Sequence, residues 1–90
     1  MAPVSAEADM DRVPRFFFHL YDDFIVLDEE GSDLADVGAA RGEAIRSARS
    51  IMVEQIGHGR LKLGHRIEVE DANGEPVLTL TFAEAVTVER

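Results

Sequence analysis

The residues best suited to chemistry in this 90-residue chain lie in the stretch RFFFHLYDD, near its N-terminal end. His19, Asp22 and Asp23 are of the types that bind metal ions or transfer protons. Their spacing is unfavourable, because both aspartates follow the strand in a turn, and neither His58 nor His65 has a sequence offset that brings it to His19. A small-molecule or metal-binding domain centred on His19 and this acidic turn is therefore the alternative hypothesis.

Other catalytic signatures are absent from the sequence. There is no cysteine, no glycine-rich phosphate loop, no nucleophile elbow and no zinc-binding pair of residues. The acids of the stretch DEEGSDLAD lack the ligand spacing of a calcium-binding EF-hand loop, so a solvated acidic loop is the better interpretation. We predict a non-enzymatic protein with no catalytic residues, no metal ligands and no cofactor.

Charge argues against two classes of partner. Eighteen acidic and nine basic residues give a net charge of -9, and a chain of that sign repels nucleic acid and anionic membranes. No apolar run approaches the roughly 18 residues that span a bilayer. The lack of cysteine fits a reducing compartment, so we predict a cytoplasmic protein. Residues 1–12 are small, acidic and aperiodic, which predicts a disordered tail before a single domain over residues 13–90.

Hydrophobic alternation predicts the first strand and its two faces. Phe16 and Phe18 fall on the side expected to face the core, whereas Phe17, His19 and Tyr21 fall on the other. After the Asp-Asp turn, residues 24–27 are apolar and β-branched enough for a second short strand, so the two elements form a predicted hairpin.

A change in the spacing of the apolar residues predicts a helix. Asp36 is the candidate N-cap, and from Val37 onward the apolar residues recur on one arc for about 20 residues. Gly57 and Gly59 are expected to end the helix.

A second hairpin follows in RIEVEDANGEPVLTLTF. A two-residue Asn-Gly turn sets Val69 opposite Leu78, and Glu68 opposite Thr79 on the other face. Together the elements predict an α+β domain of ββαββ order, in which two antiparallel hairpins form a sheet with one helix packed on one face. The pattern does not choose between a helical turn and an extended piece for residues 83–90.

One helix can cover only one side of this sheet, so the second face is the predicted interface. Aromatic residues on an uncovered face favour another surface there, and we predict a homodimer joined through the sheet face or a strand edge, with an unidentified protein as a further partner. A solvated face on a monomer is the plainer alternative. The candidate interface residues are Phe17, His19, Tyr21, Arg66, Glu68 and Thr79.

Arg41 is awkward on the helical wheel, because it points along the direction of the apolar arc. A guanidinium there needs a carboxylate or a route to solvent. We predict a structural ion pair of Arg41 with Asp28, Glu30 or Asp36 that ties the acidic loop to the helix.

The order of residues also resembles a known family. PRFFFHLYDD, DEEGSDLADVGAAR, SARSIM and RIEVEDANGEPVLTLTF together resemble the short bacterial proteins catalogued as domain of unknown function 6894. The resemblance covers residues 14–82, and it implies a fold and a bacterial, cytoplasmic origin but no activity. The positions that carry it are Pro14 to Phe18, Asp28, Gly31, Leu34, Asp36, Arg41, Ile67, Val69, Asp71, Gly74 and Val77.

Overall fold

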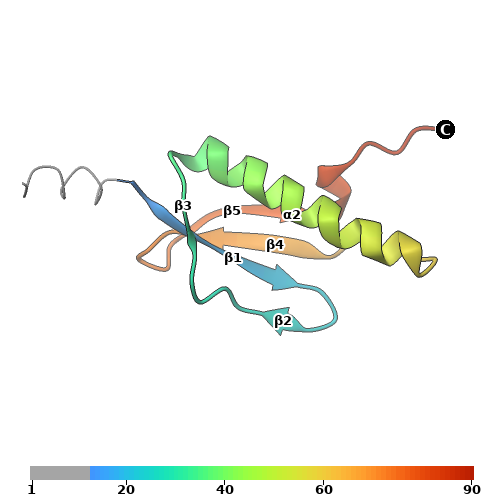
Figure 1. The fold of residues 1–90 in the computed structure, drawn as a ribbon, viewed down its shortest axis with the longest axis horizontal. Helices are drawn as coiled ribbons and strands as arrows, with labels where there is room; N and C mark the ends of the chain where they lie inside the picture. Colours follow the sequence, from blue (N-terminus) through green and yellow to red (C-terminus); the bar gives the residue numbers. More distant parts are fainter. Residues whose placement is uncertain (1–12) are drawn as a thin grey trace, which may run out of the picture.

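A computed structural model of the chain describes residues 13–90. The tail predicted over residues 1–12 lies outside the described residues. The structure confirms the predicted α+β class, with a helix laid on one face of an antiparallel sheet (Figure 1). In chain order the elements are β1 (Arg15–Tyr21), β2 (Ile25–Val26), β3 (Ser32–Asp33), α2 (Val37–Gly57), β4 (Arg66–Glu70), β5 (Pro76–Thr81) and the 3-10 helix η1 (Phe82–Ala85).

The sheet runs in the order β2-β1-β4-β5, and β3 pairs with the first two residues of β1. The first and second hairpins therefore meet along β1 and β4, where Phe18 lies opposite Val69 and His19 opposite Glu68. Helix α2 lies over β4 and β5, and β2 lies at the edge of the sheet away from the helix (Figure 1). The side chains of β2 consequently have little cover.

The core lies between the helix and the sheet. Three alanines of α2, Ala40, Ala44 and Ala48, are 0% exposed, and these small side chains let the helix backbone approach the sheet closely. The alanines pack with larger side chains from the strands and η1, namely Phe16, Ile67, Val69, Leu80 and Phe82.

The helix begins and ends as predicted. The Asp36 side chain accepts the backbone N–H of Ala39 over 2.8 Å, which satisfies one of the free donors of the first turn. The helix ends at Gly57, and Gly59 has a φ of 83°, a left-handed conformation that glycine adopts without strain.

Three local predictions need correction. The second strand is only Ile25–Val26, shorter than the predicted residues 24–27. The stretch predicted as an acidic loop contains β3, which adds a fifth strand. The second hairpin has the predicted pairing of Val69 with Leu78, but a bulge after Val69 sets Glu70 opposite Pro76.

Side-chain hydrogen bonds explain the longer turn of that hairpin. The Asp71 carboxylate accepts the backbone N–H of Asn73 and of Glu75, both over 2.9 Å. An aspartate that bonds the backbone ahead of it stabilises a turn of its own, so the turn begins at Asp71 and not at the Asn-Gly pair. The undecided C-terminal stretch begins as η1, where Thr81 and Glu84 form a capping box.

Candidate functional site

His19 is the most buried polar residue of the predicted site. It is 8% exposed, not half exposed as expected for a strand histidine on an open face. Its Nδ1 accepts the backbone N–H of Asp28 over 3.0 Å, and its Nε2 lies 3.1 Å from a carboxylate oxygen of Glu70. The loop that follows β2 folds back on β1 at this point, and the sequence pattern carried no sign of that contact.

These two partners determine the tautomer of His19. An N–H donor faces Nδ1, so Nδ1 must carry a lone pair, and the ring proton sits on Nε2, where it is donated to Glu70. Both ring nitrogens are thereby occupied within the chain. The acidic turn contacts a different histidine, because Asp23 lies 3.7 Å from Nε2 of His65. The site imagined around His19, Asp22 and Asp23 is not assembled.

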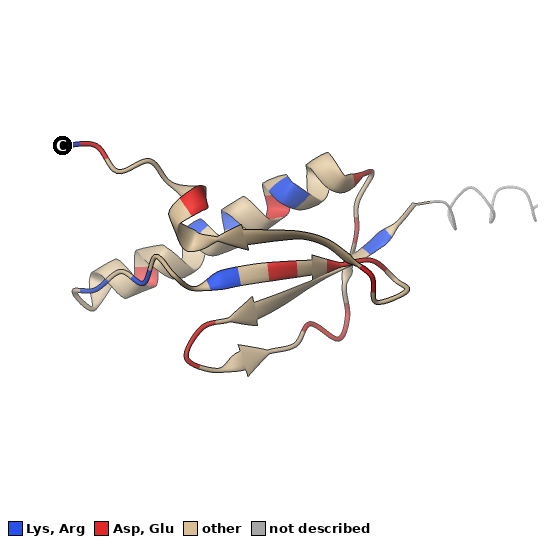
Figure 2. Cartoon of the chain, turned by 180° about the vertical axis from the view of Figure 1, so that it is seen from behind, with Lys and Arg blue, Asp and Glu red and all other residues tan. Residues whose placement is uncertain are grey.

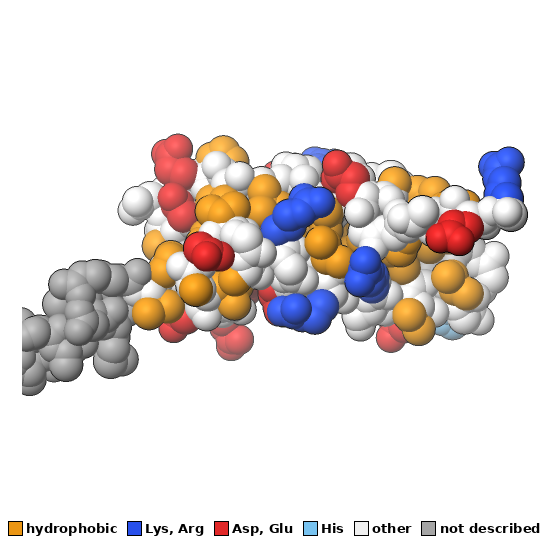
Figure 3. All heavy atoms as spheres, turned by 90° about the horizontal axis from the view of Figure 1, so that it is seen from above, with side chains coloured by type: hydrophobic (Ala, Val, Ile, Leu, Met, Phe, Trp, Pro, Cys, Tyr) orange, Lys and Arg blue, Asp and Glu red, His pale blue; other side chains and the backbone are white. Residues whose placement is uncertain are grey.

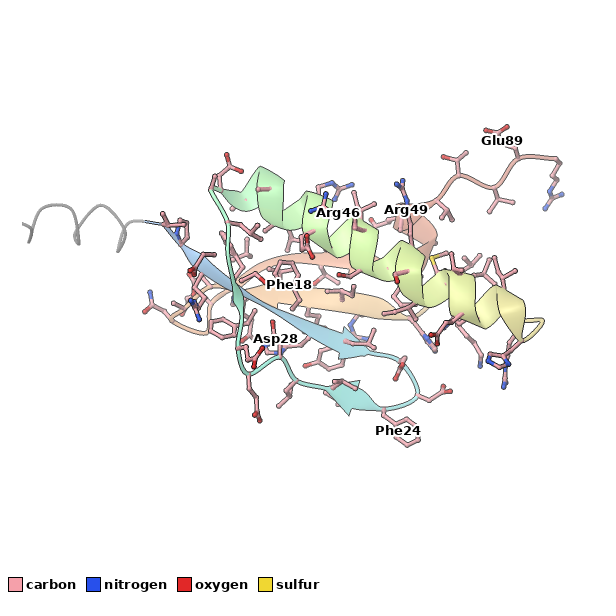
Figure 4. All side chains as sticks on the ribbon, viewed as in Figure 1. Phe18, Phe24, Asp28, Arg46, Arg49 and Glu89 are labelled. Carbon is pink, nitrogen blue, oxygen red and sulfur yellow. The ribbon has the colours of Figure 1, made fainter. Side chains whose placement is uncertain are left out.

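Asp28 organises the loop next to His19. One carboxylate oxygen accepts the N–H groups of Glu30 and Gly31, and the other accepts that of Phe18 on β1 over 3.0 Å. Burial raises the pKa of this carboxyl, but the N–H donors of Gly31, Phe18 and Glu30 outweigh it, and the pKa lies below its ordinary value. Figure 4 shows Asp28 beside β1, at the end of the segment that leaves β2.

Arg41 does not form the predicted ion pair. It is exposed, and within residues 13–90 it makes no ion pair with Asp28, Glu30 or Asp36. The carboxylates of Asp28 and Asp36 already accept hydrogen bonds from backbone N–H groups, so neither depends on Arg41 for a partner. Arg41 lies instead near Glu84, whose pKa is lowered first by the backbone N–H of Thr81 and more weakly by the charge of Arg41.

Arg15 makes the contact that was assigned to Arg41. Its guanidinium donates to both carboxylate oxygens of Asp33, over 2.8 and 3.0 Å, and to the carbonyl oxygen of Glu30 over 2.9 Å. The hydrogen bond with Arg15 lowers the pKa of Asp33. Planar paired contacts of this kind are specific to arginine. The acidic loop is thus tied to β1 and not to the helix.

The predicted interface face is largely occupied by contacts within the chain. The guanidinium of Arg66 lies 4.4 Å from the ring centroid of Tyr21 and donates to Glu68 over 2.6 Å. Phe17 and Arg15 close on Gly31 from the same side. Of the six candidate interface residues, Thr79 alone is exposed. The face is a set of satisfied polar and aromatic pairs, with little free apolar surface.

A polar hollow of about 250 Å³ lies where the β1–β2 turn meets the end of α2. It carries both charge signs, with Asp22 and Asp23 on one wall and Arg60 and Lys62 on another. Within residues 13–90 there is no group of three or more side chains placed to hold a metal ion, nor a helix long and apolar enough to cross a bilayer.

A continuous run of exposed apolar residues lies at the sheet edge. Phe24 is 77% exposed, Ile25 62%, Val26 54% and Leu27 58%. Figure 4 shows Phe24 projecting away from the sheet. The sequence interpretation expected a strand here but not its position at the edge, although the four apolar residues between two acidic runs were the available signal. We call residues 24–27 the β2 edge.

A second hollow, which is apolar and has a volume of about 350 Å³, lies between the end of α2 and the C-terminal segment. Val53, Ile56 and Val88 contribute exposed side chains to it. The nearby outer surface of the helix carries exposed arginines, including Arg46 and Arg49, which Figure 4 labels. Figure 3 shows several basic side chains in blue in the middle of this face of the molecule. Arg49 also donates to the carbonyl oxygen of Ala85 over 2.7 Å.

Comparison with known proteins gives one match. Residues 15–83 match a family model described as "Domain of unknown function (DUF6894)". No curated protein and no solved structure matches the chain.

Proposed function

Since the match spans most of the chain, the protein belongs to the DUF6894 family, and we propose that it is a non-enzymatic interaction module that docks through the β2 edge. This choice is narrower than the expectation from sequence, which named the sheet face or a strand edge and placed its candidate interface residues on the sheet face. A bacterial, cytoplasmic origin and the lack of nucleic-acid or membrane binding, both expected from the sequence, belong to the same proposal.

One observation carries the proposal: four consecutive apolar side chains are each more than half exposed along a strand edge. Fully burying an exposed side chain of this size is worth about 1.5–3 kcal/mol, and the exposed part of each of these four would gain a share of that. Natural proteins usually protect an edge strand with charge, proline or a covering element, because an open edge pairs readily with other chains. The apolar side chains of β2 lack that protection themselves.

The backbone of the β2 edge is also available. Because the N–H of Asp22 bonds the carbonyl oxygen of Phe24 and Val26 pairs with Leu20, the alternation of an antiparallel ladder turns the N–H and C=O groups of Ile25 and Leu27 away from β1. Two residues with outward backbone groups can accept an added strand.

The contrast with the sheet face supports the edge over the face. Tyr21, Arg66 and Glu68 already satisfy one another, so covering them would free no comparable apolar area from water. The homodimer predicted from sequence stays a prediction, and the same experiment tests it.

The experiment compares Val26→Lys with Thr79→Lys. Both introduce the same charge at an exposed strand position, the first at the β2 edge and the second on the sheet face. Light scattering over a concentration series reports self-association, and affinity capture from the native cell reports other partners. The proposal expects association to be lost in Val26→Lys and kept in Thr79→Lys, with both thermal midpoints near that of the wild type. Loss in Thr79→Lys alone would assign docking to the sheet face.

A further inference from the structure

The β2 edge is flanked by acids on both sides. Figure 2 shows the uncharged strand between two red loops. Asp23, Glu29 and Glu30 are exposed, and the side chains of Glu29 and Glu30 make no ion pair within residues 13–90. Arg60 and Lys62 line the hollow that contains Asp23, so the negative charge is least offset at the Glu29 end.

This charge pattern opposes a second copy of the chain. When two β2 edges pair antiparallel about Val26, outward-facing Ile25 meets Leu27 of the second copy. The same register brings the bend that holds Asp23 next to the bend that holds Glu29 of the second copy, twice by symmetry. Like charges directly opposite each other on paired strands are destabilising.

No other segment of the chain itself is better suited to bind at the β2 edge. Its basic stretch HGRLKLGHR joins α2 to β4 and has leucines between basic residues, but the N–H groups of Arg60 and Lys62 already donate to Gln55. A strand added to β2 would need those groups free. Residues 1–12 contain three acids and one base, so their charge does not complement the edge.

We infer that the β2 edge binds an extended segment of another protein, with alternating apolar residues between two Lys or Arg residues six positions apart. That spacing brings one basic residue near the bend that holds Asp23 and the other near the bend that holds Glu29, at the two ends of the edge. Ile25 and Leu27 share one face of the extended segment, so apolar residues at alternate positions of the partner meet them. This inference rests on the proposed docking through the β2 edge and adds the chemistry of the partner.

The test uses two capped peptides, KTVTVTK and ETVTVTE, which differ only in the charge of their end residues. Each is titrated into the 90-residue protein at low salt, and the amide signals of Ile25 and Leu27 are followed by NMR. KTVTVTK should bind about tenfold more tightly than ETVTVTE, and the preference should shrink in about 0.5 M salt. In the double variant Asp23→Lys/Glu29→Lys the preference should reverse.

Two variants separate failure of this inference from failure of the docking proposal. Val26→Lys should weaken both peptides, and binding unaffected by it would overturn docking at the β2 edge together with this inference. If the two peptides bind equally well and Val26→Lys abolishes the binding of both, only the predicted preference for basic end residues is overturned.

Self-association supplies an independent arm of the test. The wild type should stay monomeric in light scattering, whereas Glu29→Lys should form dimers, because Asp23 then faces a lysine of the second copy. If the wild type forms dimers and Val26→Lys dissociates them, the inference is overturned in favour of a second copy of the chain. If Glu29→Lys stays monomeric, the antiparallel register about Val26 is wrong.

Discussion

Nδ1 of His19 accepts the backbone N–H of Asp28 over 3.0 Å, and this bond joins the loop after β2 to the middle strand β1. The Asp28 carboxylate returns a bond to β1 by accepting the N–H of Phe18. A strand histidine that looks catalytic in the sequence thus has a structural role, because it supplies the acceptor that a backbone group of the loop requires.

Replacing His19 with alanine should lower the free energy of unfolding by about 1–3 kcal/mol, because the part-buried N–H of Asp28 loses its acceptor and the Glu70 carboxylate loses its donor. Urea unfolding measures the change. His58→Ala is the matched control, since His58 is exposed, and it should change the free energy by less than about 0.5 kcal/mol. Equal effects of the two substitutions would contradict the role assigned to His19.

The lowered pKa of Asp28 makes stability depend on pH. A carboxyl whose pKa is lower in the folded state stabilises the fold above its ordinary pKa, 3.8 here, and loses that contribution as the pH falls through the lower folded pKa. Asp28→Asn should therefore cost stability at pH 7, and the deficit relative to wild type should shrink below pH 3.8. Denaturant unfolding at several pH values tests this, with Glu29→Gln, an exposed acid, as the control that keeps the wild-type profile.

Alanine substitutions at Gly31 and Gly74 distinguish the cost of backbone strain from the cost of steric crowding. Both have positive φ, 75° and 79°. A Cβ at Gly31 would lie 2.9 Å from side-chain atoms of Arg15 and Phe17, whereas one at Gly74 meets nothing within 4 Å. Gly74→Ala should cost about 1 kcal/mol from the backbone alone. Gly31→Ala should lower stability clearly more than Gly74→Ala, as measured by thermal unfolding. Similar losses of stability would show that the loop around Gly31 can shift to make room.

The alanine stripe of α2 sets the distance from helix to sheet. Ala44 is 0% exposed, so Ala44→Leu has no room and should lower the free energy of unfolding by about 1–3 kcal/mol. Ser50→Leu makes a comparable enlargement on the exposed side of the same helix and should have an effect within about 0.5 kcal/mol. A tolerated Ala44→Leu would mean that the helix can shift outward from the sheet.

The fold could be predicted where local rules act alone. Strand alternation, the Asp36 cap and the pairing of Val69 with Leu78 follow from side-chain period and hydrogen-bonding chemistry within short stretches. Three positions that carry the family resemblance also act within short stretches: Asp28 and Asp71 hold turns through their own carboxylates, and Gly31 through its positive φ.

The site could not be predicted in the same way, because it depends on segments that meet only after folding. Residue types alone named His19 and the acids as candidates, but only the tertiary structure showed His19 bonded to Asp28 and Glu70. It also assigned the loop's arginine contact to Arg15 in place of Arg41, since Arg15 lies opposite Asp33 in the β1–β3 pair.

The sequence by itself determined the types of the longer elements, the two faces of β1 and an acidic chain with four apolar residues between acidic runs. The tertiary structure decided that these four residues form and flank an edge strand, beyond the reach of the helix. The reason is physical: strand order and burial depend on contacts between residues far apart in the chain, and periodicity within a segment carries no information about which edge stays open.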